Sequence, residues 1–385
     1  MKKTLIKLII LFSVVFILGS CNDPIFFMVH EEIPILKPFI DGSPTNFVRF
    51  GDDMYVASGK KIFIFRKNAS KWVNWVKLDN RVTGLAATNA SLYALYLNKD
   101  SDDGRIRNFK SGSDLSLSNV QSIYASGDVL FACLRNDNKY SIHFRKEGAS
   151  VFTRIPGMSS DSILYGAASN NDKTFYYLCT NEGIYYIEKS QIDTPSNLPD
   201  KLPVLEDSNF TGIIELKNGY VAAITKDGKL YNINKITITE AAKFSDERES
   251  TGALALWYRY PGDTMPSLLL VGRKEIYYSN SSAYTNGYVE ITLDTTDPID
   301  PNTGNPNPFS GRISGTFSDP GKGTPSSIDN YDRYMSSLGK KPVNHIIQTP
   351  ADINSNMTLF ASTQQNGVWS YKDRGKGEQQ WNAEE

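Results

Sequence analysis

The chain has 385 residues, with 41 basic and 42 acidic side chains and a net charge of −1. A balance this close to neutral argues against a nucleic-acid-binding protein, which needs a basic face. A single hydrophobic core stops growing near about 250–300 residues, so this chain is too long for one such core. Aromatic residues make up 12% of the sequence, and no long stretch has the i, i+3, i+4 apolar spacing of helices. Both features favour β structure.

The first 21 residues have the features of a targeting segment. Three lysines precede an apolar run at residues 8–18, which is shorter than the ~20 residues of a membrane-spanning helix. Leu18, Gly19 and Ser20 then stand directly before Cys21. This arrangement resembles the bacterial lipobox, and the resemblance implies cleavage before Cys21 and attachment of lipid to it. An ordinary signal peptide beside a chance cysteine is the alternative.

The resemblance implies a lipid-anchored protein of the cell envelope, at the outer membrane and facing either the periplasm or the exterior. A short lipobox leader and a body rich in Tyr, Asn and Lys are also similar in style to spirochaete lipoproteins. Residues 1–20 are expected to form the signal peptide. Residues 21–45, with prolines at 24, 34, 38 and 44, are expected to form a tether, because prolines exclude a regular helix.

A repeat occupies residues 46–385. Its first unit, residues 47–78, contains four short apolar runs at 47–50, 54–57, 61–65 and 72–78, separated by turns rich in Gly, Asn, Asp and Lys. Such alternation predicts an antiparallel meander of four strands. Similar units follow at 82–119, 120–155, 163–198, 210–244, 252–293 and 343–382. The sequence therefore predicts an all-β, seven-bladed β-propeller with a WD40-like repeat plan, in which each blade is buried against its neighbours.

Two regions depart from the repeat. Residues 295–342 contain seven prolines and six glycines in 48 residues, so we expect a long surface insertion before the last blade, with nothing to bury. The units also suggest no strand exchange that would close the ring, unless residues 33–40 supply one.

The sequence predicts neither a metal site nor a cofactor. Cys133 and Cys179 occupy equivalent places in neighbouring units, and packed sheets lie ~10 Å apart whereas disulfide Cα atoms rarely exceed ~7 Å. We therefore expect two buried free thiols. His30, His143 and His345 do not stand at metal-ligand spacing with a cysteine.

The acidic loop at residues 98–104 has oxygen-bearing side chains at alternate positions, as calcium loops do. Its glycine falls one place late and no glutamate follows at the twelfth position. These departures favour a solvated hairpin tip over a calcium site.

Three units end in a strand, a polar turn and an aromatic residue, at Trp72, Phe152 and Trp381. This pattern resembles the Asp-box hairpin of sialidase-like and sortilin-like propellers, although the box is nowhere complete. In those families the box is structural, so the resemblance does not imply hydrolysis. The sequence also has no Gly-x-Ser-x-Gly nucleophile motif and no phosphate loop, so we expect no enzymatic activity.

These observations predict a lipid-anchored cell-envelope β-propeller that acts as a protein-binding scaffold for envelope proteins. The insertion and the hairpin tip at residues 100–103 are the expected contact points, because they project beyond the repeat. The alternatives are a surface adhesin or glycan-binding lectin and, third, a carbohydrate-active enzyme.

Overall fold

The computed structural model describes residues 38–384 with internal gaps at 99–102, 171, 199–203, 206–208, 217–218, 245–248, 259–265, 267, 275–286, 294–312, 314–315, 318–337, 339–340, 350–357 and 374–378. The leader, Cys21, His30 and most of the expected tether therefore lie outside the described residues. One compact unit begins at Pro38 and continues to the end of the chain.

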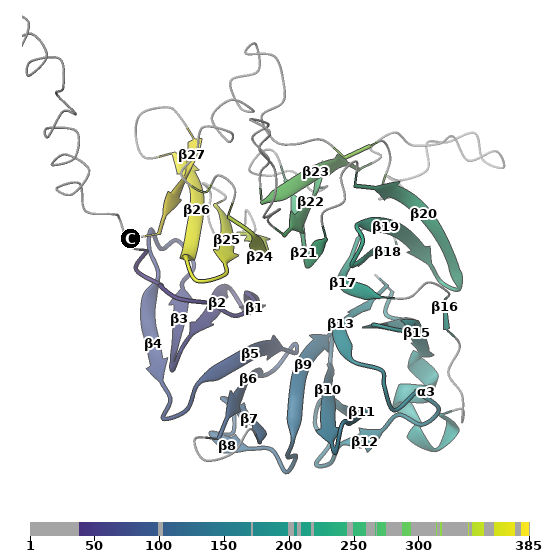
Figure 1. Ribbon diagram of the computed structural model, residues 1–385. Coiled ribbons are helices and arrows are strands. Elements are labelled where there is room, and N and C mark those ends of the chain that lie inside the picture. Colours follow the sequence, from purple (N-terminus) through teal and green to yellow (C-terminus); the bar gives the residue numbers. More distant parts are fainter. Residues whose placement is uncertain are drawn as a thin grey trace, which may run out of the picture. The chain divides into compact units, whose positions relative to one another are not determined.

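Seven antiparallel sheets follow one another around a ring (Figure 1). The first four blades are β1–β4 (Val48–Phe50, Asp53–Ser58, Lys61–Phe65, Val73–Lys77), β5–β8 (Val82–Ala87, Leu92–Leu97, Gly104–Asn108, Ser113–Asp114), β9–β12 (Val120–Ser126, Val129–Asn136, Lys139–Lys146, Thr153–Arg154) and β13–β16 (Leu164–Ser169, Phe175–Thr180, Gly183–Glu188, Val204–Leu205). The last three are β17–β20 (Phe210–Glu215, Tyr220–Thr225, Lys229–Asn234, Thr237–Lys243), β21–β23 (Ser250–Trp257, Leu268–Arg273, Tyr288–Thr292) and β24–β27 (Val343–Gln348, Leu359–Thr363, Gly367–Asp373, Gln379–Ala383).

The architecture confirms the predicted all-β, seven-bladed propeller. Six blades have four strands, and three strands of the sixth are described. Within the described residues, helix is limited to α3 (Lys189–Asp193) and the short 3-10 turn η1 (Pro195–Asn197). In the sixth blade the strand that pairs with β22 is β23.

The second strand of each blade forms most of the core. In β10 the first six residues are all buried. Side chains at odd-numbered positions pack against blade 4, and those at even-numbered positions pack against blade 2. A strand that is covered on both faces is apolar throughout rather than alternating. This explains the continuous apolar runs that marked the repeat units in the sequence.

The first strand of each blade lies nearest the axis, where the backbones crowd together. β13, β17 and β21 are in contact with one another in series. Gly212 and Gly252 allow this approach, since a Cβ on Gly212 would overlap the carbonyl group of Gly252. Gly252 also has a φ of +83°, which favours glycine.

The segment that precedes β1 closes the ring by pairing with the last blade. The segment that enters at Pro38 runs beside the last blade. Backbone hydrogen bonds join Phe39 N to Glu384 O (2.5 Å), Val368 N to Ile40 O (2.9 Å) and Gly367 N to Gly42 O (2.9 Å). Of the segment 33–40 that the sequence offered for closure, residues 38–40 are described, and they contact blade 7 in this way.

Aromatic packing completes the same junction. Phe360 of β25 lies with its ring centroid 5.1 Å from both Phe65 and Trp72 of blade 1 and 6.4 Å from Phe47. Ile40 is fully buried in the same cluster. The residue that follows the polar turn of the first unit, Trp72, is therefore a core residue between blades 1 and 7.

Among the described residues, three amide side chains each pair with both the N–H and the C=O of one distant backbone residue. Two of these links join neighbouring blades, and the third joins blade 5 to the insertion. Asn46 pairs with Leu85 (2.7 and 3.0 Å), Asn232 with Ile313 (3.3 and 3.1 Å), and Gln348 with Tyr258 (2.9 and 2.6 Å). Each link reproduces the hydrogen bonds of a β-bridge through a side chain. We call these the amide clamps.

The insertion at residues 295–342 is not wholly a surface excursion. Ile313 and Leu338 are buried, and Phe317 packs against Phe244 with ring centroids 5.0 Å apart. Ile313 also forms an antiparallel bridge with Leu293, directly after β23. The expectation that this stretch has nothing to bury is wrong, because isolated apolar residues in it fill the space beside the third strand of blade 6.

Candidate functional site

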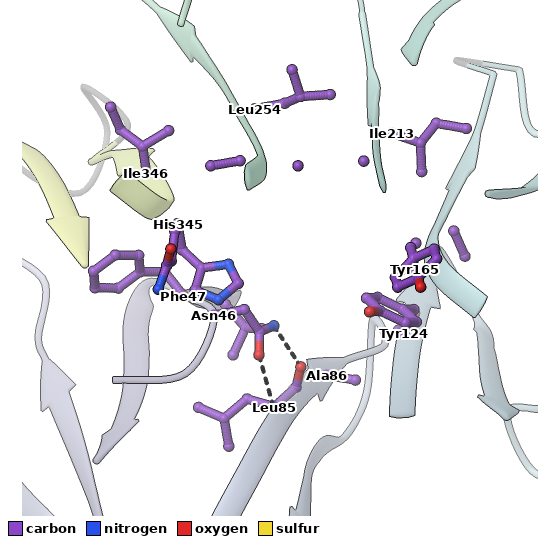
Figure 2. Close-up of a pocket in the computed structure, with 18 of the residues that line it drawn as sticks. Asn46, Phe47, Leu85, Ala86, Tyr124, Tyr165, Ile213, Leu254, His345 and Ile346 are labelled. Atoms are coloured by element: carbon purple, nitrogen blue, oxygen red, sulfur yellow. Dashed lines mark hydrogen bonds between the residues drawn. The ribbon is translucent and has the colours of Figure 1, made fainter. Parts of the chain in front are cut away.

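A polar channel runs along the propeller axis and encloses a volume of about 460 Å³. The first strand of every blade, or the residues just before it, contributes to its wall. Figure 2 shows His345 and Asn46 on one side and Tyr124 and Tyr165 on the other. Small-molecule sites typically enclose about 300–1,000 Å³, so the channel is large enough to hold a ligand.

The channel contains ionisable side chains but no carboxylate among the described residues that line it. Burial raises the pKa of both Tyr124 and Tyr165, so both phenols stay protonated and can donate hydrogen bonds. Burial lowers the pKa of His345 to about 4, so its imidazole is neutral near pH 7. Arg49 also lies at the channel wall, and its Nε donates a hydrogen bond to Gly51 O at 3.1 Å in the exposed turn after β1.

A second candidate site lies on the outer part of blade 1, residues 59–78. This stretch contains six basic residues and no acidic ones: Lys60, Lys61, Arg66, Lys67, Lys71 and Lys77. All six are exposed. Within the described structure, the ion pair formed by this set joins Lys67 Nζ to Asp52 Oδ2 at 3.0 Å. We call this region the blade 1 surface.

Aromatic residues accompany these charges. Val73 and Trp75 of the outer strand β4 are each 37% exposed. The Trp75 ring lies between Tyr55 and Phe109, with centroids 5.1 and 4.9 Å away. Trp75 is the extra residue at an irregularity in the pairing of β3 with β4, and bulges of this kind re-aim side chains at sheet edges.

A groove of about 400 Å³ lies beside this aromatic group, between blades 1 and 2. Tyr96 and Arg107 line it, and both contact Asp114, with Tyr96 Oη 2.6 Å from Oδ2. The groove therefore combines an aromatic wall with polar groups that hold one another in place.

The residues singled out in the sequence have mostly structural positions. Cys133 and Cys179 are buried free thiols, which confirms that prediction. The described residues contain no group of His, Cys, Asp and Glu arranged to hold a metal ion. Residues 99–102 of the acidic loop lie outside the described residues, and Asp103 accepts hydrogen bonds from Arg105 and Asn119.

One serine–histidine pair occurs away from the channel. Ser141 Oγ lies 3.2 Å from His143 Nε2 on β11. Burial, followed by the nearby charge of Arg154, lowers the pKa of His143. An activated nucleophile also needs a third group that orients the base, and no described residue is seen to supply one.

Sequence reasoning missed both candidate sites, but for different reasons. The blade 1 surface has a sequence signal, the run of six basic residues without an acidic one. The channel has no local signal, because its wall is assembled from seven separate segments. The insertion and the tip at 100–103, which the sequence favoured as contact points, lie largely outside the described residues.

The fold and the channel define a seven-bladed β-propeller, and comparison with solved structures agrees. The chain is similar to a chain of the mitotic checkpoint complex (TM-score 0.53, 11% identity, 88% of this chain and 93% of that one). It is similar to the β-propeller domain of Cps50 (Swd1) from Myceliophteria thermophila (0.52, 10%, 88% and 100%). It is also similar to the GH74 enzyme of Niastella koreensis (0.55, 12%, 89%), of which it spans about half, 54%.

Likeness at such low identity shows the fold alone. Neither a protein-family model nor a curated protein matches the chain. Within the part of the chain that is described, no helix combines the length and apolar character needed to cross a bilayer.

Proposed function

We propose that this protein is a lipid-anchored β-propeller of the bacterial cell envelope that binds a partner protein through the blade 1 surface. The leader that ends in Leu18-Gly19-Ser20-Cys21 supports the anchor. The propeller fold supports protein binding in general, because a rigid ring of sheets holds surface residues in fixed positions. The observation that carries the proposal is the group of six exposed basic side chains within residues 59–78, which also contain the partly exposed Trp75.

The charges of this surface are arranged at a cost to the free protein. Lys61 and Lys77 lie directly opposite each other on β3 and β4, and like charges in this position destabilise a sheet. An acidic partner would relieve that repulsion. Lysines also protect sheet edges from aggregation, but this alone does not account for an aromatic group and a groove beside them.

Trp75 supplies the apolar contact of such an interface. Tryptophan is enriched among residues that dominate binding energy, and arginine and aromatic residues are common at interface centres. Because Tyr55 and Phe109 hold the ring, it loses little conformational freedom on binding.

Charge reversal on this surface tests the proposal. The full-length protein and a Lys61→Glu/Lys77→Glu variant would be crosslinked in membranes of the source cells and purified. We expect one or more acidic envelope proteins to co-purify with the native chain and to be lost from the variant. Lys139→Glu/Lys189→Glu is the matched control, because these lysines are also exposed but belong to blades 3 and 4, away from the groove.

The proposal is wrong if the same proteins are recovered with both variants, or if no specific protein is recovered with the native chain. Saturable binding of glycans by a chain that captures no protein would instead support the lectin hypothesis. Co-sedimentation with protein-free anionic vesicles, lost in the Lys61→Glu/Lys77→Glu variant, would show that the blade 1 surface contacts lipid headgroups.

A further inference from the structure

The outer strands of the blades differ in length. Those of blades 2, 3 and 4 have two residues each, and β4 has five, with an irregularity in its pairing to β3. β20, at the rim of blade 5 (Figure 1), has seven residues and is the longest outer strand described. Natural sheets protect their edges with short or irregular strands. Blade 5 therefore presents an edge of a kind that blades 2 to 4 do not have.

The outer edge of β20 is unpaired and nearly neutral. Its partner in the described structure is β19, and among the described residues no backbone hydrogen bond reaches it from the other side. The charges of its Glu240 and Lys243 cancel. Residues 237–239 are all β-branched, as strands favour, and Ile236 just before them is 61% exposed. An edge with these properties is a template for another strand.

The pairing of β20 with β19 determines which of its backbone groups point outward. A two-residue turn joins Asn234 to Thr237, which pair with each other, and the pair that flanks such a turn is hydrogen-bonded. The register is regular from Thr237 to Glu240. Thr237 and Thr239 therefore direct their N–H and C=O groups toward β19. Ile238 and Glu240 direct theirs to the unpaired side.

We propose that the β20 edge binds the same edge of a second copy of this protein, as an antiparallel strand pair with its two-fold axis at Ile238. Each Ile238 then lies opposite Ile238 of the other copy and exchanges both backbone hydrogen bonds with it. Each Thr237 lies opposite Thr239 of the other copy, and such threonine pairs stabilise antiparallel sheets. The two copies of blade 5 form one continuous sheet.

The charges at the ends of this stretch favour a second copy as the occupant. Glu240 lies opposite Ile236 of the other copy, beside the turn that carries Lys235. Symmetry repeats this arrangement, and it places no two like charges opposite each other. Glu240 and Lys235 are both exposed, and no described residue forms an ion pair with either one. The edge is therefore complementary to itself in charge as well as in hydrogen bonding.

Sedimentation equilibrium of the full-length protein in detergent would measure this self-association. One strand pair is a small interface, so we expect a dimer that dissociates on dilution. Glu240→Pro removes one outward N–H from each copy and no bond to β19, and it should raise the dissociation constant at least about tenfold. Glu240→Ala is the matched control. It removes the same carboxylate but keeps the N–H, so the constant should change by no more than about threefold.

Disulfide formation tests the register independently. Directly opposite residues of a hydrogen-bonded pair have Cα atoms about 5.5 Å apart, which is within the range of a disulfide. Under mild oxidation Ile238→Cys should give a covalent dimer. Thr237→Cys, which faces Thr239 of the other copy, should not. The native Cys133 and Cys179 are buried and do not compete.

The proposal is overturned if the protein stays monomeric up to about 100 µM, or if Glu240→Pro and Glu240→Ala weaken the dimer equally. It is also overturned if Ile238→Cys gives no more covalent dimer than Thr237→Cys, a comparison that remains available even if the proline variant does not fold. Recovery of a different protein on a monomeric native chain, lost in Glu240→Pro, would show that another protein's strand occupies the edge instead.

Discussion

The amide clamp between Asn232 and Ile313 can be removed by one substitution, Asn232→Leu, which preserves the approximate size of the side chain. Asn232 and Ile313 are each only 3% exposed. The substitution removes two hydrogen bonds and leaves the N–H and C=O of Ile313 buried without partners. It therefore tests whether this residue of the insertion is part of the fold.

The expected loss follows from hydrogen-bond energetics. Two hydrogen bonds contribute about 1–3 kcal/mol in net terms, and an unsatisfied buried group costs about 1–3 kcal/mol. Partial relaxation of the insertion would relieve some of this, so we expect unfolding free energy to fall by about 3 kcal/mol. Asn46→Leu breaks an equivalent clamp beside the channel, where water can replace the amide, so we expect a loss of only about 1 kcal/mol there.

Urea unfolding followed by tryptophan fluorescence and circular dichroism would measure both variants. If Asn232→Leu costs less than about 0.5 kcal/mol, Ile313 is not held by the clamp and the reasoning fails. The sequence alone predicts that residues 297–340 can be replaced by a Gly/Ser linker without loss of folding. Because Ile313 is clamped and buried, we instead expect this replacement to destabilise the protein.

Four further predictions follow from particular residues. The folded pKa of His345 lies below its unfolded value of about 6.5, so its contribution to stability is complete above pH 6.5 and declines as pH falls toward about 4. Solvent in the channel reduces this effect, so we expect the unfolding free energy to fall by about 1–2 kcal/mol between pH 6.5 and about 4. Urea unfolding at each pH would measure this loss, which should be absent in His345→Gln. Burial raises the pKa of the Cys133 and Cys179 thiols. In a Cys21→Ser variant, which keeps only these two cysteines, iodoacetamide should label neither thiol in the folded protein and both in urea. Labelling of the folded protein would contradict their burial. Cys21→Ala should abolish fatty-acid labelling and release the protein from membranes, and persistent labelling would disprove the lipobox assignment. Gly212→Ala should cost about 1–3 kcal/mol by forcing two inner strands apart, whereas Gly84→Ala, where an added Cβ would meet ordinary contacts at 3.8 Å, should be nearly neutral.

The ring of blades was predictable because a propeller blade is a local structure. Each blade consists of consecutive strands joined by short turns, so its pattern of apolar runs and Gly/Asn/Asp turns lies within about forty residues of sequence. The buried, free state of Cys133 and Cys179 was predictable for the same reason, since equivalent positions on adjacent blades are separated by the packing distance of sheets.

Closure of the ring and the role of the insertion were decided by tertiary packing. Nothing around Ile40 marks it as the residue that fills the junction between blades 1 and 7, because its partners Phe360 and Trp72 are hundreds of residues apart in sequence. Ile313 stands among prolines and glycines with no strand pattern. Its position is set by the amide of Asn232, the bridge to Leu293 and apolar side chains of blades 5 and 6.

The two candidate sites divide in the same way. The basic residues of the blade 1 surface lie close together in the sequence, so the sequence by itself determines the charge of this surface. Their exposure beside Trp75 depends on how blades 1 and 2 pack. The channel is wholly a product of tertiary structure. Tyr165 and His345 are separated by 180 positions and face the same space only because seven inner strands converge on one axis, and convergence on an axis leaves no periodicity in a linear sequence.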